Sequence, residues 1–178
     1  MEIALDGVAW RIVPLEAIYR VGLDVGVELD RSRARALRRE LLRHEALGVA
    51  LSALRRRDHA TATLQQRLAR RGIRTRERQS TVETLARAGL VDDARFAHAR
   101  AGTLAARGAG NYLVAHDLET HGVGQEDAHA AIAALEPESV RAARIIAQRG
   151  ATAKTLRYLA AKGFDMGALD VAVADVDP

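Results

Sequence analysis

Two adjacent carboxylates, Asp92 and Asp93, precede His98 by a few residues in the segment GLVDDARFAHARA, residues 89–101. Paired acids near a histidine are residue types that can hold a divalent metal or transfer protons in a hydrolase. The same pair also suits the start of a helix, where unpaired backbone N–H groups and the positive end of the helix dipole favour carboxylates. The secondary structure around the pair distinguishes these two interpretations.

The spacing of the other candidate ligands argues against a metal centre. His98 lies five residues after Asp93, and His116 and His121 are also five apart, whereas two ligands on one helix are usually about three or four residues apart. The chain has no cysteine, which excludes thiolate nucleophiles, disulfides and cysteine-based zinc sites. It also lacks a nucleophile elbow, a Walker loop and a dinucleotide-binding glycine motif. We therefore predict no catalytic residue, metal or cofactor, and a metal-dependent phosphoesterase that uses the paired acids is the alternative.

A recurring helical pattern positions the acids. In LQQRLARRGI, VAHDLETHGV and TLRYLAAKGF, apolar residues at helical spacing are followed by Gly72, Gly122 and Gly163. Glycine suits the left-handed position after a helix, and the apolar residue that comes next can fold back onto the last turn. One helical stretch precedes each segment and a weaker one follows it, at 75–88, 125–135 and 165–175. This pattern predicts a unit of three short helices that is repeated three times.

The repeat pattern favours the helix-start interpretation of the paired acids. Gly89 ends the last helix of the first unit, so Asp92 falls at the N-cap of the next helix and Asp93 in its first turn. On this helix we expect Phe96 to face the core. The arginines of the helix are expected to face solvent: Arg95 and Arg100.

The first thirty residues follow a different pattern. Apolar and polar residues alternate in EIALDGVAWRIV on both sides of Asp6-Gly7, which is the strongest short signal for a β-hairpin. Asp30 is a suitable N-cap for the arginine-rich helix that follows.

The predicted fold class is therefore mainly α, with three tandem three-helix repeats in an elongated, curved array and a short N-terminal β-hairpin. We expect four segments: the hairpin and linker at 1–30, the arginine-rich helix with the first repeat at 31–90, the second repeat at 91–135 and the third at 136–178.

Charge is distributed unevenly along the chain. The net charge is only +4, but residues 31–78 hold 15 arginines against four acidic residues and carry +11, so the remaining residues carry −7. This asymmetry suggests a polyanionic or acidic partner, or else a solvated helix face. The predicted contacts are Arg55, Arg56, Arg57, Arg67, Arg70, Arg71 and Arg74. On a continuous helix the last four of these would form one stripe that could bind phosphates.

The sequence contains no run of the ~18 apolar residues that a membrane span needs. The N-terminal MEIALDGVAW lacks the basic region and apolar run of a secretory signal. We therefore expect a cytoplasmic protein without a membrane partner, and a monomer.

GLVDDARFAHARA, LQQRLARRGI, RGAGNYLVAHDLETHGV and TLRYLAAKGF resemble, in order and spacing, the hallmark segments of the RecX family of recombinase regulators. The resemblance runs from about residue 19 to the end. It implies a non-enzymatic modulator that lies along the groove of the RecA–DNA filament, limits its extension or stability, and lowers strand exchange and ATP hydrolysis. The implied partners are the RecA filament and DNA, the latter bound weakly or in a salt-dependent way. The motif residues with a structural role are Gly72, Asp92, Asp93, Arg95, Phe96, Gly122 and Gly163.

The sequence departs from the family pattern at several positions. Ala60 and Thr63 stand where a serine and a glutamate usually cap the second helix of the first repeat, and Thr61 is expected to replace that cap. In the third helix of this repeat, polar residues replace apolar ones: Arg78 and Thr81. A stand-alone basic helical protein that binds DNA remains the alternative function.

Overall fold

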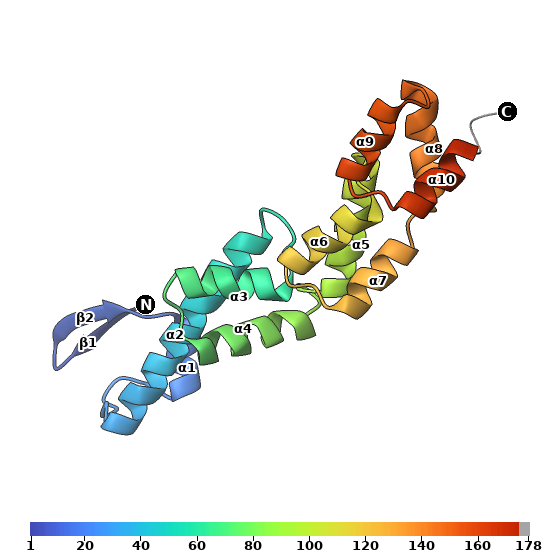
Figure 1. Ribbon diagram of the computed structural model, residues 1–178. Helices are drawn as coiled ribbons and strands as arrows, with labels where there is room; N and C mark the ends of the chain where they lie inside the picture. Colours follow the sequence, from blue (N-terminus) through green and yellow to red (C-terminus); the bar gives the residue numbers. More distant parts are fainter. Residues whose placement is uncertain (175–178) are drawn as a thin grey trace. The chain divides into compact units, whose positions relative to one another are not determined.

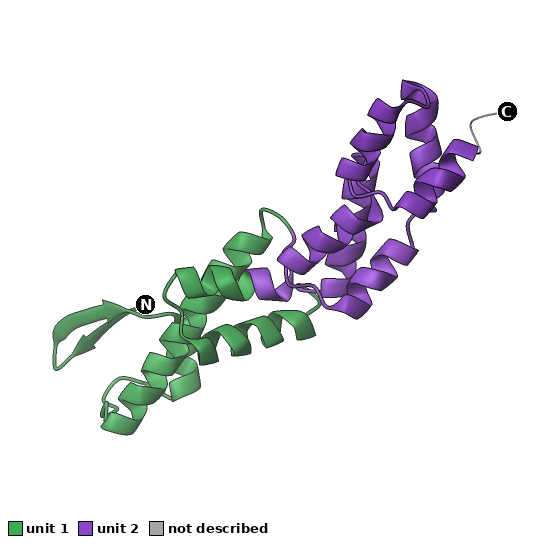
Figure 2. Ribbon diagram, viewed as in Figure 1, with its two compact units in different colours: residues 1–57, 64–90 green, residues 58–63, 91–178 purple. Residues whose placement is uncertain are grey.

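The computed structural model describes residues 1–174 and shows a mainly helical protein with an N-terminal β-hairpin (Figure 1). These residues form ten helices and one two-stranded antiparallel sheet. The predicted fold class is confirmed in this respect. The chain divides into two compact units, one formed by residues 1–57 and 64–90, the other by residues 58–63 and the chain from residue 91 onward (Figure 2).

The first unit contains the hairpin, a long helix and two further helices. Its elements are β1 (Glu2–Leu5), β2 (Val8–Ile12), α1 (Leu15–Val21), α2 (Arg31–Leu54), most of α3 (Thr61–Arg70) and α4 (Thr75–Arg87). The hairpin turns at Asp6 and Gly7, whose φ angles of 51° and 83° are those that a tight hairpin turn requires. Asp30 caps α2 as predicted, because its carboxylate accepts a 2.7 Å hydrogen bond from the N–H of Arg33.

The core of the first unit anchors the hairpin, which would be marginal by itself. Val13, Ala17, Ile18 and Leu37 form a buried cluster, and Ile3 of β1 packs against it. Further along the chain, α2 packs against α4.

One buried position of α4 carries a polar side chain, as the departure from the family pattern suggested. Thr81 is only 2% exposed, and within residues 1–174 its hydroxyl has no hydrogen-bond partner. Arg78 instead turns its guanidinium toward the backbone and donates to the carbonyl of Ile73 at 2.9 Å. Burial of an unpaired hydroxyl is unfavourable, so Thr81 weakens the packing of this helix.

The second unit contains six helices in sequence. They are α5 (Asp93–Ala106), α6 (Asn111–Thr120), α7 (Gln125–Ala133), α8 (Glu138–Arg149), α9 (Ala153–Ala161) and α10 (Met166–Ala174). One buried cluster joins α5, α6 and α7, and a second joins α8, α9 and α10. The last residues of the predicted third repeat, 175–178, lie outside the described residues.

The three glycines of the repeat pattern end their helices in the predicted left-handed conformation, with φ angles of 77° at Gly72, 74° at Gly122 and 82° at Gly163. The residue after each glycine donates its N–H to a carbonyl five residues earlier, which is the Schellman arrangement. These bonds run from Ile73 to Leu68, from Val123 to Leu118 and from Phe164 to Leu159. Each motif buries the apolar residue that follows the glycine.

The first of the paired acids caps its own helix. The carboxylate of Asp92 accepts a 2.9 Å hydrogen bond from the N–H of Arg95, which confirms the predicted helix start. Phe96 packs, partly buried, against the core of α5–α7, and Arg95 is exposed.

The second acid of the pair caps a different helix. Asp93, the first residue of α5, accepts a 2.7 Å hydrogen bond from the N–H of Thr61, the first residue of α3. Glu138, the first residue of α8, accepts a 2.6 Å bond from the N–H of Asn111, the first residue of α6. The prediction that Thr61 supplies the cap of α3 was wrong, because an acid 32 residues further along the chain satisfies that helix end.

Helix ends in the second unit also meet head to tail. Residues 58–63, which include the start of α3, belong to this unit. The hydroxyl of Thr63 donates to the carbonyl of His121, just after α6, at 3.1 Å. A β-carbon at Gly122 would overlap the β-carbon of Ala62. Glycine therefore allows the end of α6 to contact the first turn of α3.

The same contact recurs between the end of α9 and the start of α6. The N–H groups of Gly110 and Tyr112 donate to the carbonyls of Lys162 and Gly163, at 2.9 and 3.1 Å. Leu113 covers Gly163 so closely that a β-carbon there would lie 2.6 Å from the Leu113 nitrogen. Carbonyls left unpaired at the end of one helix thus accept bonds from donors left unpaired at the start of another.

Gly163→Ala tests this contact, with Gly108→Ala as the matched control. Both glycines have a left-handed φ, 82° and 79°, but a β-carbon at Gly108 would meet only Ile145 at an ordinary 3.7 Å. We expect Gly108→Ala to lower the free energy of unfolding by about 1–2 kcal/mol through backbone strain. Gly163→Ala should cost at least about 1 kcal/mol more through overpacking against Leu113. Chemical denaturation followed by circular dichroism measures both, and equal losses would contradict the head-to-tail contact.

Candidate functional site

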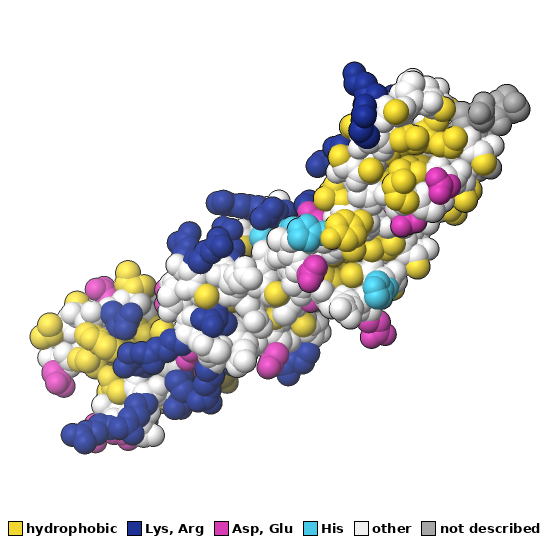
Figure 3. All heavy atoms as spheres, viewed as in Figure 1, with side chains coloured by type: hydrophobic (Ala, Val, Ile, Leu, Met, Phe, Trp, Pro, Cys, Tyr) yellow, Lys and Arg dark blue, Asp and Glu magenta, His cyan; other side chains and the backbone are white. Residues whose placement is uncertain are grey.

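The seven arginines that the sequence predicts as contacts all lie in the first unit. This unit has 18 arginines and 10 acidic residues, a net charge of +8, whereas the second unit carries −4. Dark-blue side chains are spread over the first unit in the space-filling view (Figure 3). The first unit therefore presents most of the positive charge of the protein.

The predicted arginines are clustered around two helix ends. Arg55, Arg56 and Arg57 directly follow α2 and are exposed. Arg70 is the last residue of α3, and the exposed Arg71 comes after it. The remaining two are the half-buried Arg67 and the exposed Arg74. We refer to these seven side chains as the arginine surface.

The prediction of a single helical stripe was wrong for Arg74. The Schellman motif at Gly72 ends α3 and turns the chain. Arg74 then occupies the N-cap position of α4 with an extended backbone, at φ −68° and ψ 156°. The arginines before and after Gly72 are thus carried by two different helices.

The guanidinium groups of the arginine surface are available for a partner. Within the described part of the chain, none of the seven forms an ion pair with a carboxylate at 4.0 Å or less. Planar guanidinium groups bind phosphate or carboxylate oxygens in a bidentate manner. The arrangement therefore suits a polyanion or an acidic protein surface.

Sequence reasoning did not single out three further exposed arginines on the long helix. Arg31, Arg35 and Arg38 of α2 follow one another at intervals of four and three residues, so they share one helix face. This spacing is visible in the sequence. They extend the basic character of the first unit toward the start of α2.

Two arginines of the second unit, in contrast, join helices within the fold. Arg100 was expected to face solvent, but its Nε and Nη2 donate to the two carboxylate oxygens of Asp117, both at 2.8 Å. The pair joins α5 to α6. Hydrogen bonds from Arg100 hold the pKa of Asp117 below its usual range, and the same bonds raise the pKa of Arg100.

Arg141 of α8 is almost fully buried, at 6% exposure, and has a structural role. Its guanidinium donates to the carbonyls of Ala109 and Glu136, at 2.7 and 3.0 Å, and to the side-chain oxygen of Asn111. It also lies 5.7 Å from the ring centre of Phe164. Burial lowers the pKa of Arg141, but a guanidinium stays charged in proteins. The side chain therefore joins α8 to the start of α6.

The paired acids are used as helix caps, as described above. Among residues 1–174, no three His, Cys, Asp or Glu side chains lie close enough together to hold a metal ion. The ring nitrogen Nδ1 of His98 lies 2.9 Å from the carbonyl of Ala94, and that of His121 lies 2.7 Å from the carbonyl of Asp117. The geometry thus gives the acids an architectural role.

The same residues contain no helix that is both long and apolar enough to cross a membrane.

Curated relatives of this chain share one name. "Regulatory protein RecX" of Xanthomonas citri is 37% identical over 100 residues, which cover 56% of this chain and 62% of that protein. The protein of the same name from Xanthomonas oryzae pv. oryzae (strain MAFF 311018) is 33% identical over 126 residues, covering 65% and 79% of the two chains. The one from Stenotrophomonas maltophilia (strain R551-3) is 36% identical over 126 residues, covering 65% and 77%. No family model matches.

Two solved structures have a similar fold. "Crystal structure of regulatory protein RecX" superposes with a TM-score of 0.81 at 19% identity, covering 97% of this chain and 92% of that one. RecX from Lactobacillus salivarius superposes with a TM-score of 0.67 at 15% identity, covering 76% and 97%.

The Arg100–Asp117 pair predicts a pH-dependent stability. The pKa of Asp117 is lower in the folded state than its unfolded value of about 3.9. The pair therefore stabilises the fold fully above that value and loses its effect as pH falls through the folded-state pKa. We expect Asp117→Asn to lower the free energy of unfolding by about 1 kcal/mol at pH 7, with a difference from the unsubstituted protein that shrinks below about pH 4. Urea unfolding measured between pH 7 and pH 2.5 checks this.

Glu119→Gln, at an exposed position of the same helix, is the matched control and should leave stability nearly unchanged. A loss for Asp117→Asn that stays constant over this pH range would contradict the assigned pKa direction.

Proposed function

The chain belongs to the RecX family of regulatory proteins, and on this premise we propose that it is a non-enzymatic regulator of the RecA recombinase. The protein binds along the RecA–DNA filament and limits the extension or stability of the filament. It thereby modulates recombination, DNA repair and the SOS response. It acts in the cytoplasm as a monomer, with DNA as a weak or salt-dependent second partner.

The observation that carries this proposal is the arginine surface of a unit with a net charge of +8. Its guanidinium groups form no ion pairs within the described chain and are suited to DNA phosphates or to acidic side chains. A filament of protein on DNA offers both kinds of group. We infer the partner from the family name, and the contacting residues from the charge distribution.

The helix order supports a repeated binding unit. We propose that α2–α4, α5–α7 and α8–α10 correspond to the three predicted repeats. The last two sets each have a core of their own. Tandem repeats of this kind present extended surfaces, which suit a partner that is itself periodic.

The DNA-dependent ATPase activity of RecA tests the proposal. We expect sub-stoichiometric amounts of the protein to reduce the rate of ATP hydrolysis, because a filament whose extension is limited contains fewer active subunits. A coupled assay with RecA on single-stranded DNA measures this rate over a range of ratios. Unchanged hydrolysis at every ratio would rule the proposal out.

The arginine surface is tested by the triple substitution Arg70→Ala/Arg71→Ala/Arg74→Ala. If each side chain contacts one phosphate, the affinity of the protein for RecA–DNA filaments should fall by about tenfold or more. The magnitude of the slope of log K for this binding against log salt concentration should decrease by about 2–3. The matched control removes three exposed cations from the second unit: Arg107, Lys154 and Arg157. Fluorescence anisotropy on labelled RecA–DNA filaments measures both. Equal losses in the two variants would show that the contact is not specific to the arginine surface.

The alternative function is a stand-alone DNA-binding protein, which the excess positive charge of the first unit favours. This alternative predicts strong salt-dependent affinity for bare DNA and no effect on RecA beyond competition for DNA. Adding excess DNA to the ATPase assay distinguishes the two, because competition for DNA would then disappear. A phosphoesterase is not proposed, since Asp92 and Asp93 both accept bonds from helix N–H groups.

A further inference from the structure

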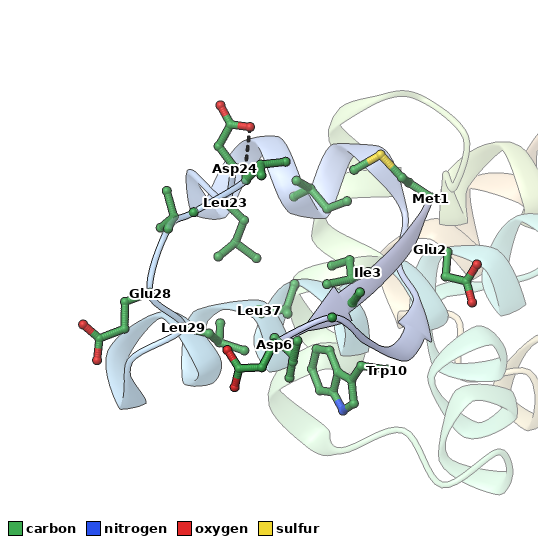
Figure 4. A pocket seen from close by; sticks show the side chains of 17 residues that line it. Met1, Glu2, Ile3, Asp6, Trp10, Leu23, Asp24, Glu28, Leu29 and Leu37 are labelled. Atoms are coloured by element: carbon green, nitrogen blue, oxygen red, sulfur yellow. Dashed lines mark hydrogen bonds between the residues drawn. The ribbon is translucent and has the colours of Figure 1, made fainter.

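A hollow of about 860 Å³ lies in the first unit, between the hairpin and the segment from Leu23 to Leu29 (Figure 4). Every residue of β1 lines it, whereas β2 contributes only Trp10. Ile18 of α1 and Leu37 of α2 line it as well. Its volume is within the range of about 300–1,000 Å³ that is typical of ligand-binding pockets.

The lining of the hollow is part apolar and part polar, and its edge is acidic. Apolar lining side chains come from both walls and include Ile3, Leu5, Trp10, Leu23, Val27 and Leu29. All ionisable side chains in the lining are acids: Glu2, Asp6, Asp24 and Glu28. In the close-up, the carboxylates of Asp24 and Glu28 point outward from the segment that forms one wall (Figure 4). A polyanion is therefore disfavoured here, although the unit as a whole is basic.

Two arginines near the hollow in sequence are already engaged. Arg33 lies 3.8 Å from the carboxylate of Asp30 and donates to the carbonyl of Glu28 at 3.1 Å. Arg11 stacks over the ring of Trp10 at 5.5 Å. Met1 also lines the hollow, and its ammonium group donates to the carbonyl of Val13 at 2.9 Å. The four carboxylates of the lining outnumber this ammonium group and the guanidinium of Arg11, so the charge of the edge favours a ligand with positive charge at its ends.

The hollow also borders an open strand edge. Among residues 1–174, β1 pairs only with β2. Every residue of β1 lines the hollow and β2 does so only through Trp10, so the strand next to the hollow is one whose outer edge is unpaired in this sheet. An unpaired edge offers backbone N–H and C=O groups to an added strand.

We propose that this hollow binds an extended, apolar segment of a protein partner whose flanking residues are Lys or Arg. The backbone of the segment pairs with β1, its apolar side chains fill the hollow between β1 and residues 23–29, and its basic flanks lie near Glu2 and Glu28. The site is separate from the arginine surface and recognises the opposite charge, so it goes beyond the regulatory function proposed above.

Selection from a phage library of random octapeptides tests the proposal with the full chain. Peptides are first depleted on the variant Glu2→Lys/Glu28→Lys and then selected on the unsubstituted protein. Both glutamates are exposed, so the variant should keep its fold, which a thermal melt verifies. Depletion also removes peptides that bind the arginine surface, which the variant retains.

We expect enriched peptides with apolar residues at alternate positions and Lys or Arg at the ends. Synthetic copies should bind the Glu2→Lys/Glu28→Lys variant at least about tenfold more weakly than the unsubstituted protein. They should bind the matched control Glu119→Lys/Glu126→Lys, which has the same change of net charge in the second unit, without loss. Methylation of alternate backbone nitrogens of the peptide should abolish binding, because it blocks strand pairing.

The proposal would be overturned by a selection that enriches no peptides or only acidic ones. Equal affinity for the two charge variants, or unchanged binding of the methylated peptide, would overturn it as well.

Discussion

The helices of the second unit are held in place by hydrogen bonds between helix ends, in which the unpaired donors of one helix bind acceptors at the end of another. An isolated helix leaves about four N–H groups and four carbonyls unpaired at its ends. Here the carbonyls after α6 and α9 accept bonds from the first turns of α3 and α6. Asp93 and Glu138, each the first residue of its own helix, bind the first N–H of α3 and α6 respectively. These contacts require glycine at positions 122 and 163, where any side chain would overlap the adjoining helix.

The arginines of the two units differ in the contacts that they make within the fold. In the second unit the buried Arg141 and the Arg100–Asp117 pair join helices to one another, so these guanidinium groups are used by the fold. In the first unit the arginine surface has no such partner among residues 1–174. The arginines proposed as contacts thus lie in a different unit from those that join helices. The acidic hollow beside β1 adds a surface of opposite character to the same basic unit.

Features that depend on neighbouring residues could be predicted from the sequence. The hairpin at Asp6-Gly7, the caps at Asp30 and Asp92 and the left-handed Gly72 all follow from contacts within about five residues. Other features could not be predicted because their partners are distant in sequence. Asp93 reaches back 32 residues and Arg100 pairs 17 residues ahead, and neither interaction leaves a periodic signal. The placement of Arg74 was wrong because the helical stripe was extended past a glycine that ends the helix.

The central claim, that the protein recognises RecA on DNA and not DNA alone, is tested most directly by a pull-down at physiological salt. Biotinylated single-stranded DNA is immobilised either bare or coated with RecA and a slowly hydrolysed ATP analogue, and the retained protein is quantified. The proposed function predicts strong retention on the filaments and weak retention on bare DNA, which an increase in salt removes first. Equal retention on both supports, or none on the filaments, would contradict it.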